Sequence, residues 1–290
     1  MIPCPQIDFT LEHIFDNLVE LPTFPKVVTK ALRVLDDPNG TTAQLVEVLK
    51  FDPALTANML RLTNSALFGL PRQVTDLHTA LTLLGQIQIR EILIASAGAP
   101  YLTRPLHGYQ MEPEDLWQHS MASALIAELL AKMCEYPDQP VLFTSALLHD
   151  IGKIVLNMFV GGRLDEILTL AQQERLTFTE AEWYTMGVDH AVIGSQILMQ
   201  WDFPPDIARA VRNHHDPDLY IQDDLSSLLA LSNILAVQLG LGVGADGFRH
   251  KINPKLLTRL GLSRQDMHRC IERALVAYEK SSDIISGYKA

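Results

Sequence analysis

One short stretch of the chain, Ser145-Ala-Leu-Leu-His-Asp-Ile-Gly-Lys153, combines residue types that are able to hold a metal ion. A neutral imidazole and a carboxylate are ligands that borderline divalent metals accept, and His149 is followed directly by Asp150. Neighbouring side chains on a helix diverge by about 100°, so the pair cannot lie on one helix face. The two side chains are able to converge on an ion beside a helix end. We therefore expect a ligand pair where a buried apolar helix, Val141 to Leu148, ends.

Histidines gather in the same half of the sequence. Of the ten in the chain, five lie between residues 119 and 215, each in an expected helix or at its end: His119, His149, His190, His214 and His215. Each of them taken alone is more often structural, as a core residue or as a cation at a helix C-terminus. Together with Asp150 they predict a shared metal site, because bundles draw metal ligands from separate helices. The remaining histidines are isolated, and we assign them no role: His13, His78, His107, His250 and His268.

Helical periodicity runs through almost the whole sequence, and strand-like alternation is scarce. We expect an all-α fold in which an N-terminal helical bundle packs on a second helical domain. A segment rich in Pro, Gly and Tyr, from Ala99-Pro100 to Pro113, predicts the junction. The expected boundaries are 1–103 for the N-terminal subdomain, 114–240 for the second subdomain and 241–290 for C-terminal helices. Residues 241–251 are Gly-rich and predict a mobile link.

Capping signals mark the expected helix starts. Thr41 with Gln44, and Thr179 with Glu182, have the spacing of a capping box, and Asp76 and Asp189 are suited to N-cap positions. Glu180, Glu182 and Asp216 are expected to be solvated or capping groups.

The composition bounds the class of protein. A chain of 290 residues with 48% hydrophobic and 20% charged residues has enough apolar content for a packed core. The formal net charge of −11 and the lack of a basic run argue against a nucleic-acid polymer as partner. No apolar run of the roughly 20 residues that span a membrane is evident, and no signal peptide begins the sequence, so we expect a cytoplasmic protein. The three cysteines, Cys4, Cys134 and Cys270, are widely spaced and predict reduced thiols.

Several local phrases resemble known families. The phrases His149-Asp-Ile-Gly-Lys153, His190-Ala-Val-Ile-Gly194 and Val211-Arg-Asn-His-His215 resemble the HD superfamily of metal-dependent phosphohydrolases, especially its HD-GYP branch, which hydrolyses cyclic di-GMP. The GYP signature is missing, because Asp-Pro-Asp-Leu-Tyr220 follows His215. Five further phrases are similar to the HDOD family: Leu21-Pro-Thr-Phe-Pro25, Asp52-Pro-Ala-Leu55, Asn64-Ser-Ala-Leu-Phe-Gly69, Ala80-Leu-Thr-Leu-Leu-Gly85 and Trp201-Asp-Phe-Pro204.

The resemblance covers about residues 15 to 240 and implies an all-α fold with an HD-like domain in a bacterial signalling or regulatory protein. It implies a metal site formed by His119, His149, Asp150, His190, His214 and His215, which would hold one or two divalent ions such as Fe, Mn or Mg. If that site is catalytic, Asp150 would bridge two ions, a bound ion would activate water for attack on a phosphoester, and Lys153 would neutralise the phosphoryl oxygens.

The chain departs from the catalytic pattern at one position. Catalytic HD proteins carry an Asp on the helix after the last histidines, and Asn233 stands at the matching place here. An amide oxygen is a weaker ligand than a carboxylate. Two functions therefore stay open: a binding module or adaptor with a metal pocket, which we favour, and a metal-dependent phosphohydrolase acting on a nucleotide or cyclic dinucleotide. A signalling protein or a nucleotide is the expected partner, no membrane is expected, and the sequence does not fix the oligomeric state.

Overall fold

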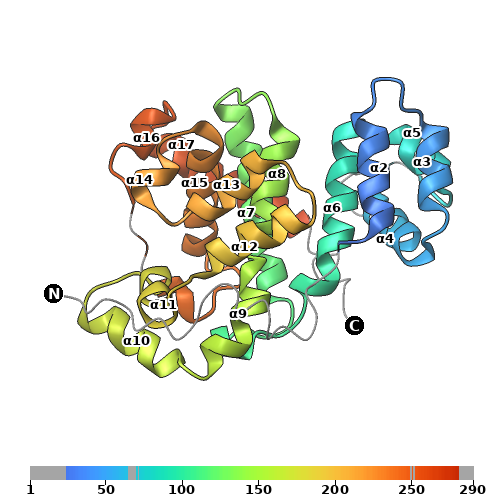
Figure 1. Cartoon of the computed structure of the whole chain (residues 1–290). Helices are drawn as coiled ribbons and strands as arrows, with labels where there is room; N and C mark the ends of the chain where they lie inside the picture. Colours follow the sequence, from blue (N-terminus) through green and yellow to red (C-terminus); the bar gives the residue numbers. More distant parts are fainter. Residues whose placement is uncertain (1–23, 65–69, 71, 249, 251, 281–290) are drawn as a thin grey trace. The chain divides into compact units, whose positions relative to one another are not determined.

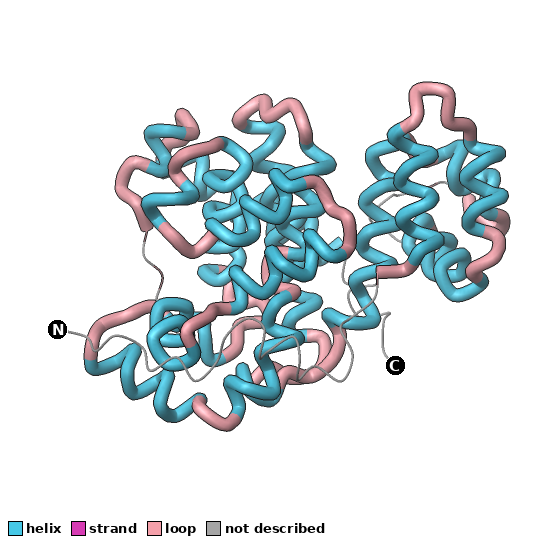
Figure 2. The backbone as a smooth tube through the Cα atoms, in the orientation of Figure 1, coloured by secondary structure: helices cyan, strands magenta, loops and turns pink. Residues whose placement is uncertain are grey.

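A computed structural model describes residues 24–64, 70, 72–248, 250 and 252–280. Helices account for the secondary structure of these residues, apart from one isolated antiparallel bridge between Leu106 and Met111 (Figures 1 and 2). The expected all-α fold is confirmed. The described residues divide into two compact units, one of residues 102–274 and one of residues 24–101 with 275–280.

The smaller unit consists mainly of five helices. They are α2 (Lys26–Asp36), α3 (Thr42–Leu49), α4 (Pro53–Thr63), α5 (Leu77–Leu83) and α6 (Gln86–Leu102). The capping box of Thr41 and Gln44 begins α3, and Asp76 caps α5, as the sequence predicts. The Asn64 side chain bonds both backbone groups of Val74, its amide donating to the carbonyl at 2.8 Å and its oxygen accepting from the N–H at 2.7 Å. This pair of bonds fixes the connection between α4 and α5.

The expected break at Ala99-Pro100 is wrong in detail, because α6 continues through Pro100 to Leu102. A proline lacks the N–H for the bond to the residue four positions earlier, and its ring crowds that residue's carbonyl, which favours an early end of the helix. The chain leaves the helix two residues later.

The larger unit holds the remaining elements. They are η1 (His107–Tyr109), α7 (Asp115–Met133), α8 (Gln139–Leu148), α9 (Gly152–Gly161), α10 (Leu164–Gln173), α11 (Phe178–Met186), α12 (His190–Gln200), α13 (Pro205–Asn213), α14 (Pro217–Tyr220), α15 (Asp224–Gln238), η2 (Ala245–Phe248), α16 (Leu256–Arg259) and α17 (Arg264–Lys280), whose last residues count with the smaller unit. Helix α7 packs on α8 and α15, and α12 packs on α13 and α9 (Figure 1). These packed helices surround the positions of the predicted ligands.

Residues 139–161, which span α8 and α9, are long and apolar enough to cross a membrane by length and composition. The sequence-based expectation that no apolar run reaches this length is therefore wrong for residues 139–161, where α8 and α9 follow each other after a short turn. Of the apolar window, 78% is buried inside the structure, as in the core helices of a packed domain.

The Gly-rich segment after α15 packs closely where the structure describes it. A Cβ atom at Gly242 would lie 1.9 Å from the Asp115 carbonyl oxygen, and Gly242 has a φ of +59°. A Cβ at Gly244 would lie 2.4 Å from the Tyr109 carbonyl oxygen. Only glycine permits this approach, so the segment reaches the start of α7 and η1.

Candidate metal centre

The helix ends of the larger unit position the predicted ligands. His149 is the C-cap of α8, His190 is the first residue of α12, and His214 is the C-cap of α13. Helix α9 begins at Gly152, where a Cβ would lie 1.9 Å from the His190 carbonyl oxygen and 2.6 Å from the Gly194 nitrogen. Glycine at 152 therefore lets the backbone after Asp150 touch the first turn of α12.

The Asp150 carboxylate lies at the centre of the cluster. Its Oδ2 atom is 3.3 Å from His149 Nε2 and 3.6 Å from His119 Nε2. Its Oδ1 atom is 3.3 Å from His190 Nε2 and 3.8 Å from His214 Nε2. The two oxygens thus face two different histidine sets. We call these the His119 side (His119, His149 and Asp150 Oδ2) and the His190 side (His190, His214, His215 and Asp150 Oδ1).

The structure brings all six predicted ligands together. On each side, one ligand atom from every residue lies within 4.8 Å of the others. His215 joins through its Nε2 atom, which is 3.0 Å from His190 Nε2. Two ligands bound at right angles to one ion at about 2.1 Å would be about 3 Å apart, so this spacing suits a shared ion. The role of the six residues as ligands stays a prediction.

Backbone carbonyls fix which ring nitrogen faces the cluster. His149 Nδ1 bonds the Ala146 carbonyl oxygen at 2.7 Å, and His214 Nδ1 bonds the Val211 carbonyl oxygen at 2.5 Å. A carbonyl only accepts, so each Nδ1 carries the proton and each Nε2 presents its lone pair. A metal-binding histidine characteristically donates its other N–H to an oxygen in this way.

Four buried polar atoms of the predicted ligands have no hydrogen-bond partner: His119 Nδ1, His149 Nε2, His214 Nε2 and Asp150 Oδ1. Buried polar atoms almost always have a partner, and an unsatisfied one costs about 1–3 kcal/mol. A divalent cation would be a partner for the imidazole nitrogens and the carboxylate oxygen that face it, all of them ligand types that it accepts. The residues present therefore fit a metal ion.

Glu182 of α11 bonds the His190 ring at Nδ1, the nitrogen opposite the one that faces Asp150. Its Oε2 atom accepts a hydrogen bond from His190 Nδ1 at 2.6 Å, and its Oε1 atom accepts one from the Tyr109 hydroxyl at 2.5 Å. Glu182 is fully buried. The expectation of a solvated or capping Glu182 is wrong, because the capping box that begins α11 consists of Thr177 and Glu180. That shift of two residues turns Glu182 toward the core.

The protonation of the cluster follows from burial and charge. Burial lowers the pKa of His119 and of His214 to about 4, so both rings are neutral near pH 7. Burial also acts to lower the pKa of His190, but the carboxylates of Glu182 and Asp150 outweigh it and raise that pKa to about 10. Burial acts to raise the pKa of Asp150, yet the Lys153 ammonium beside it holds that pKa well below its usual range. Asp150 is therefore ionised, as a ligand must be, whereas His190 must give up a proton when it binds an ion.

Replacing Glu182 with Gln is expected to weaken metal binding about 10- to 100-fold, the usual effect of losing the partner that orients a ligand. His190 would lose the carboxylate that holds its ring and polarises its far nitrogen. Titration with Mn²⁺, followed by calorimetry, measures the change. The matched control is Glu180→Gln on the same helix, because Gln also completes a capping box. Equal affinities for the two variants would contradict this role of Glu182.

Asn233 of α15 lies in the cluster on the His119 side. Its Oδ1 atom is 3.0 Å from His119 Nε2, and the Asn233 side chain is buried. An amide oxygen only accepts, so His119 Nε2 carries the proton in this bond. That nitrogen has no lone pair to offer an ion while the bond persists.

Lys153 of α9 is buried between two carboxylates. Its ammonium lies 2.6 Å from Asp150 Oδ2 and 2.5 Å from Asp246 Oδ2 of η2. Burial acts to lower the pKa of Lys153, but Asp150 and Asp246 raise it above its usual value. The segment that carries Asp246 also places the His250 ring 5.9 Å from the His215 ring. The view of His250 as isolated is therefore wrong, because the Gly-rich approach after α15 returns it to the cluster.

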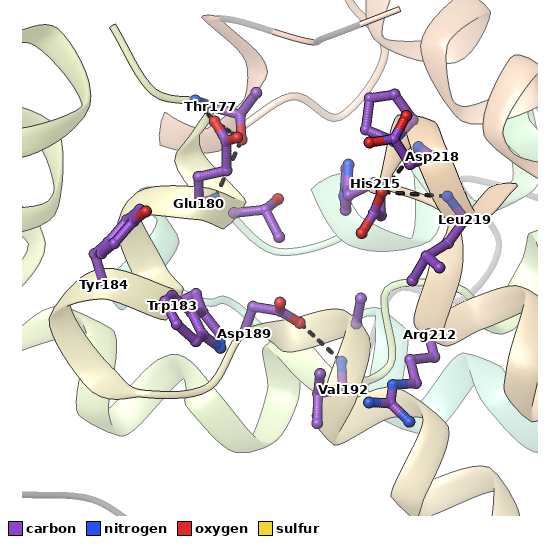
Figure 3. A pocket seen from close by; sticks show the side chains of 14 residues that line it. Thr177, Glu180, Trp183, Tyr184, Asp189, Val192, Arg212, His215, Asp218 and Leu219 are labelled. Carbon is purple, nitrogen blue, oxygen red and sulfur yellow. Dashed lines mark hydrogen bonds between the residues drawn. The ribbon is translucent and has the colours of Figure 1, made fainter. Parts of the chain in front are cut away.

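A cavity of about 550 Å³ reaches the cluster at His215 (Figure 3). It is lined by Thr177, Thr179, Glu180, Trp183, Tyr184, Asp189, Ala191, Val192, Arg212, His215, Asp216, Pro217, Asp218 and Leu219. Four of these residues carry carboxylates, while Arg212 is the one guanidinium. Glu180, Asp189 and Asp216 cap the N-termini of α11, α12 and α14, so those helix ends already have their acceptors. The cavity is therefore acidic on balance.

A family comparison identifies the chain. The model of the HDOD domain matches residues 21–217, more than half of the sequence. The chain belongs to the HDOD family. Asp246 and His250 lie beyond the matched range.

Solved structures and a curated relative resemble this HDOD protein. An HDOD domain protein of unknown function from Geobacter sulfurreducens is 25% identical, with a TM-score of 0.72 over 96% of this chain and 94% of that one. A proposed phosphohydrolase from Shewanella amazonensis SB2B shares the fold at 22% identity and a TM-score of 0.71, over 96% and 98% of the two chains. A proposed signal transduction protein from Marinobacter aquaeolei VT8 shares it at 20% and 0.73, over 100% and 63%. An uncharacterized protein of Treponema pallidum (strain Nichols) is 25% identical over 76% of this chain, which spans 43% of that relative's length.

Proposed function

We propose that this HDOD protein is a regulatory binding module of bacterial signal transduction that holds a divalent metal ion and hydrolyses phosphoesters weakly or not at all. The observation that carries this proposal is the state of the His119 side. There Asn233 replaces the carboxylate of catalytic HD proteins and bonds the nitrogen that His119 would give to an ion. Reaction at a phosphoester through paired ions needs both sides of Asp150.

The position of Lys153 supports the same proposal. In a phosphohydrolase this ammonium would stabilise the charge on phosphoryl oxygens as the reaction proceeds. Here two carboxylates bond it, and its side chain is 2% exposed. A substrate phosphate would have to displace both carboxylates to reach it.

The cavity beside His215 also argues against a multiply charged phosphoester. Four carboxylates repel such a ligand, and Arg212 supplies the one full positive charge among the lining residues. An entry for nucleotide substrates would be expected to show the opposite balance.

The alternative function is a metal-dependent phosphohydrolase, which the ionised Asp150 and the neutral His119 and His214 keep open. An ion held there would supply Lewis-acid activation of water. His190 and Glu182 would then orient the site, while Lys153 would have to leave Asp246 to contact the substrate.

Replacing Asn233 with Asp tests the proposal. A carboxylate at this position adds a negative charge beside the cluster, so the affinity for Mn²⁺ is expected to rise by about tenfold or more. Turnover of an aryl phosphodiester or of a cyclic dinucleotide is expected to stay at background, because Lys153 remains bonded to Asp150 and Asp246. His149→Ala in the same background provides the control for any activity that depends on the metal. Robust metal-dependent hydrolysis by the unmodified protein would contradict the proposal.

A further inference from the structure

The two sides of Asp150 are not equivalent. On the His190 side, Asp150 Oδ1 and His214 Nε2 are buried without a hydrogen-bond partner, and the nearest basic group to Oδ1 among the described residues is the His190 ring, whose Nε2 is 3.3 Å away. On the His119 side, Asp150 Oδ2 already bonds the Lys153 ammonium at 2.6 Å. His149 Nε2 and His119 Nδ1 are also buried without a partner, so the difference between the two sides lies in the carboxylate: Oδ2 is bonded to the Lys153 ammonium, whereas Oδ1 has no lysine or arginine partner among the described residues.

Lys153 has the surroundings of a bound cation. Its nitrogen lies between Asp150 Oδ2 and Asp246 Oδ2, at 2.6 and 2.5 Å. Carboxylate oxygens from two separate segments are ligands of the kind that a divalent ion takes. The Tyr109 ring lies on a third side, with its centroid 5.8 Å from the Lys153 nitrogen.

From this asymmetry we infer that the Lys153 ammonium takes the place of a second metal ion, so that the cluster binds one divalent ion, on the His190 side. This inference rests on the metal centre of the proposed function. The ammonium balances part of the charge of Asp150 and Asp246 with a single positive charge attached to the chain itself. The Asn233 bond to His119 contributes because it occupies Nε2, the nitrogen that lies 3.6 Å from Asp150 Oδ2. Asp246 and Lys153 are thus positioning residues that set the number of ions.

Replacing Lys153 with Met removes the ammonium and keeps a long flexible side chain that packs well in a core. The His119 side would then expose two uncompensated carboxylates. Equilibrium dialysis against Mn²⁺ alone, with elemental analysis, is expected to give one ion per chain for the wild type and two for Lys153→Met. Lys153→Arg keeps the positive charge and is expected to retain one ion. Lys153→Met combined with Asp246→Asn is expected to return to one ion, because the second carboxylate is lost.

A second measurement uses the wild-type protein and therefore does not depend on the folding of a variant. Electron paramagnetic resonance of the Mn²⁺-loaded wild type is expected to show an isolated ion without spin coupling to a neighbour. Two ions or a coupled pair in the wild type would overturn the inference and leave the metal centre intact. A folded Lys153→Met variant that still binds one ion would also overturn it. A wild type that binds no ion would contradict the metal centre of the proposed function and this inference together.

Discussion

Replacing Asp150 with Asn is expected to abolish tight binding of a divalent ion and to lower the free energy of unfolding by about 3–5 kcal/mol. Asp150 is the one residue that both ligand sets share, so its loss removes a charged oxygen from each side. The same change leaves the buried Lys153 with Asp246 as its remaining carboxylate partner. Calorimetric titration with Mn²⁺ and urea unfolding of the metal-free protein measure the two effects separately.

Asp138→Asn is the matched control for this change. Asp138 is the N-cap of α8, and its side chain accepts from the Val141 N–H. Asn serves equally well at an N-cap, so this variant should bind metal as the wild type does. Retention of tight metal binding by Asp150→Asn would show that the cluster does not coordinate through its central carboxylate.

Replacing Gly152 with Ala is expected to destabilise the protein by at least about 1–3 kcal/mol, because a new methyl group would meet fixed backbone. The added Cβ would lie 1.9 Å from the His190 carbonyl oxygen, and no rotation of a side chain relieves that contact. Helix α9 must then move away from α12, which separates Asp150 from His190. A lower urea midpoint and a weaker affinity for Mn²⁺ should therefore appear together.

Gly162→Ala makes the same chemical change where there is room. The nearest heavy atom to a Cβ at that position is 3.9 Å away, and Gly162 has an ordinary helical φ of −75°. Its stability should stay within about 0.5 kcal/mol of the wild type. If Gly152→Ala matched this control in stability and metal affinity, the close approach of α9 to α12 would not position the ligands.

Local patterns were enough to predict much of this molecule. The periodicity of apolar residues gave the helices, and the Thr41–Gln44 box gave the start of α3, because both signals lie within a few residues of one another. The histidine spacing likewise predicted the cluster, since each ligand sits at a position that its own helix defines.

The residues that sequence reasoning missed act across long separations. Glu182 meets Tyr109, and Asp246 meets Lys153, and neither pair has a local spacing that marks it. Tertiary packing decides such contacts. One usable signal existed: the glycines at 242 and 244 indicate a close backbone approach, which carries Asp246 and His250 back to the cluster.

The most direct test of the metal centre is elemental analysis of protein purified without a chelating column or a histidine tag. We predict about one equivalent of a divalent first-row metal per chain, retained after dialysis and lost in the Asp150→Asn variant. A folded protein that carries no metal and takes up none from Mn²⁺, Fe²⁺ or Zn²⁺ solution would contradict the account.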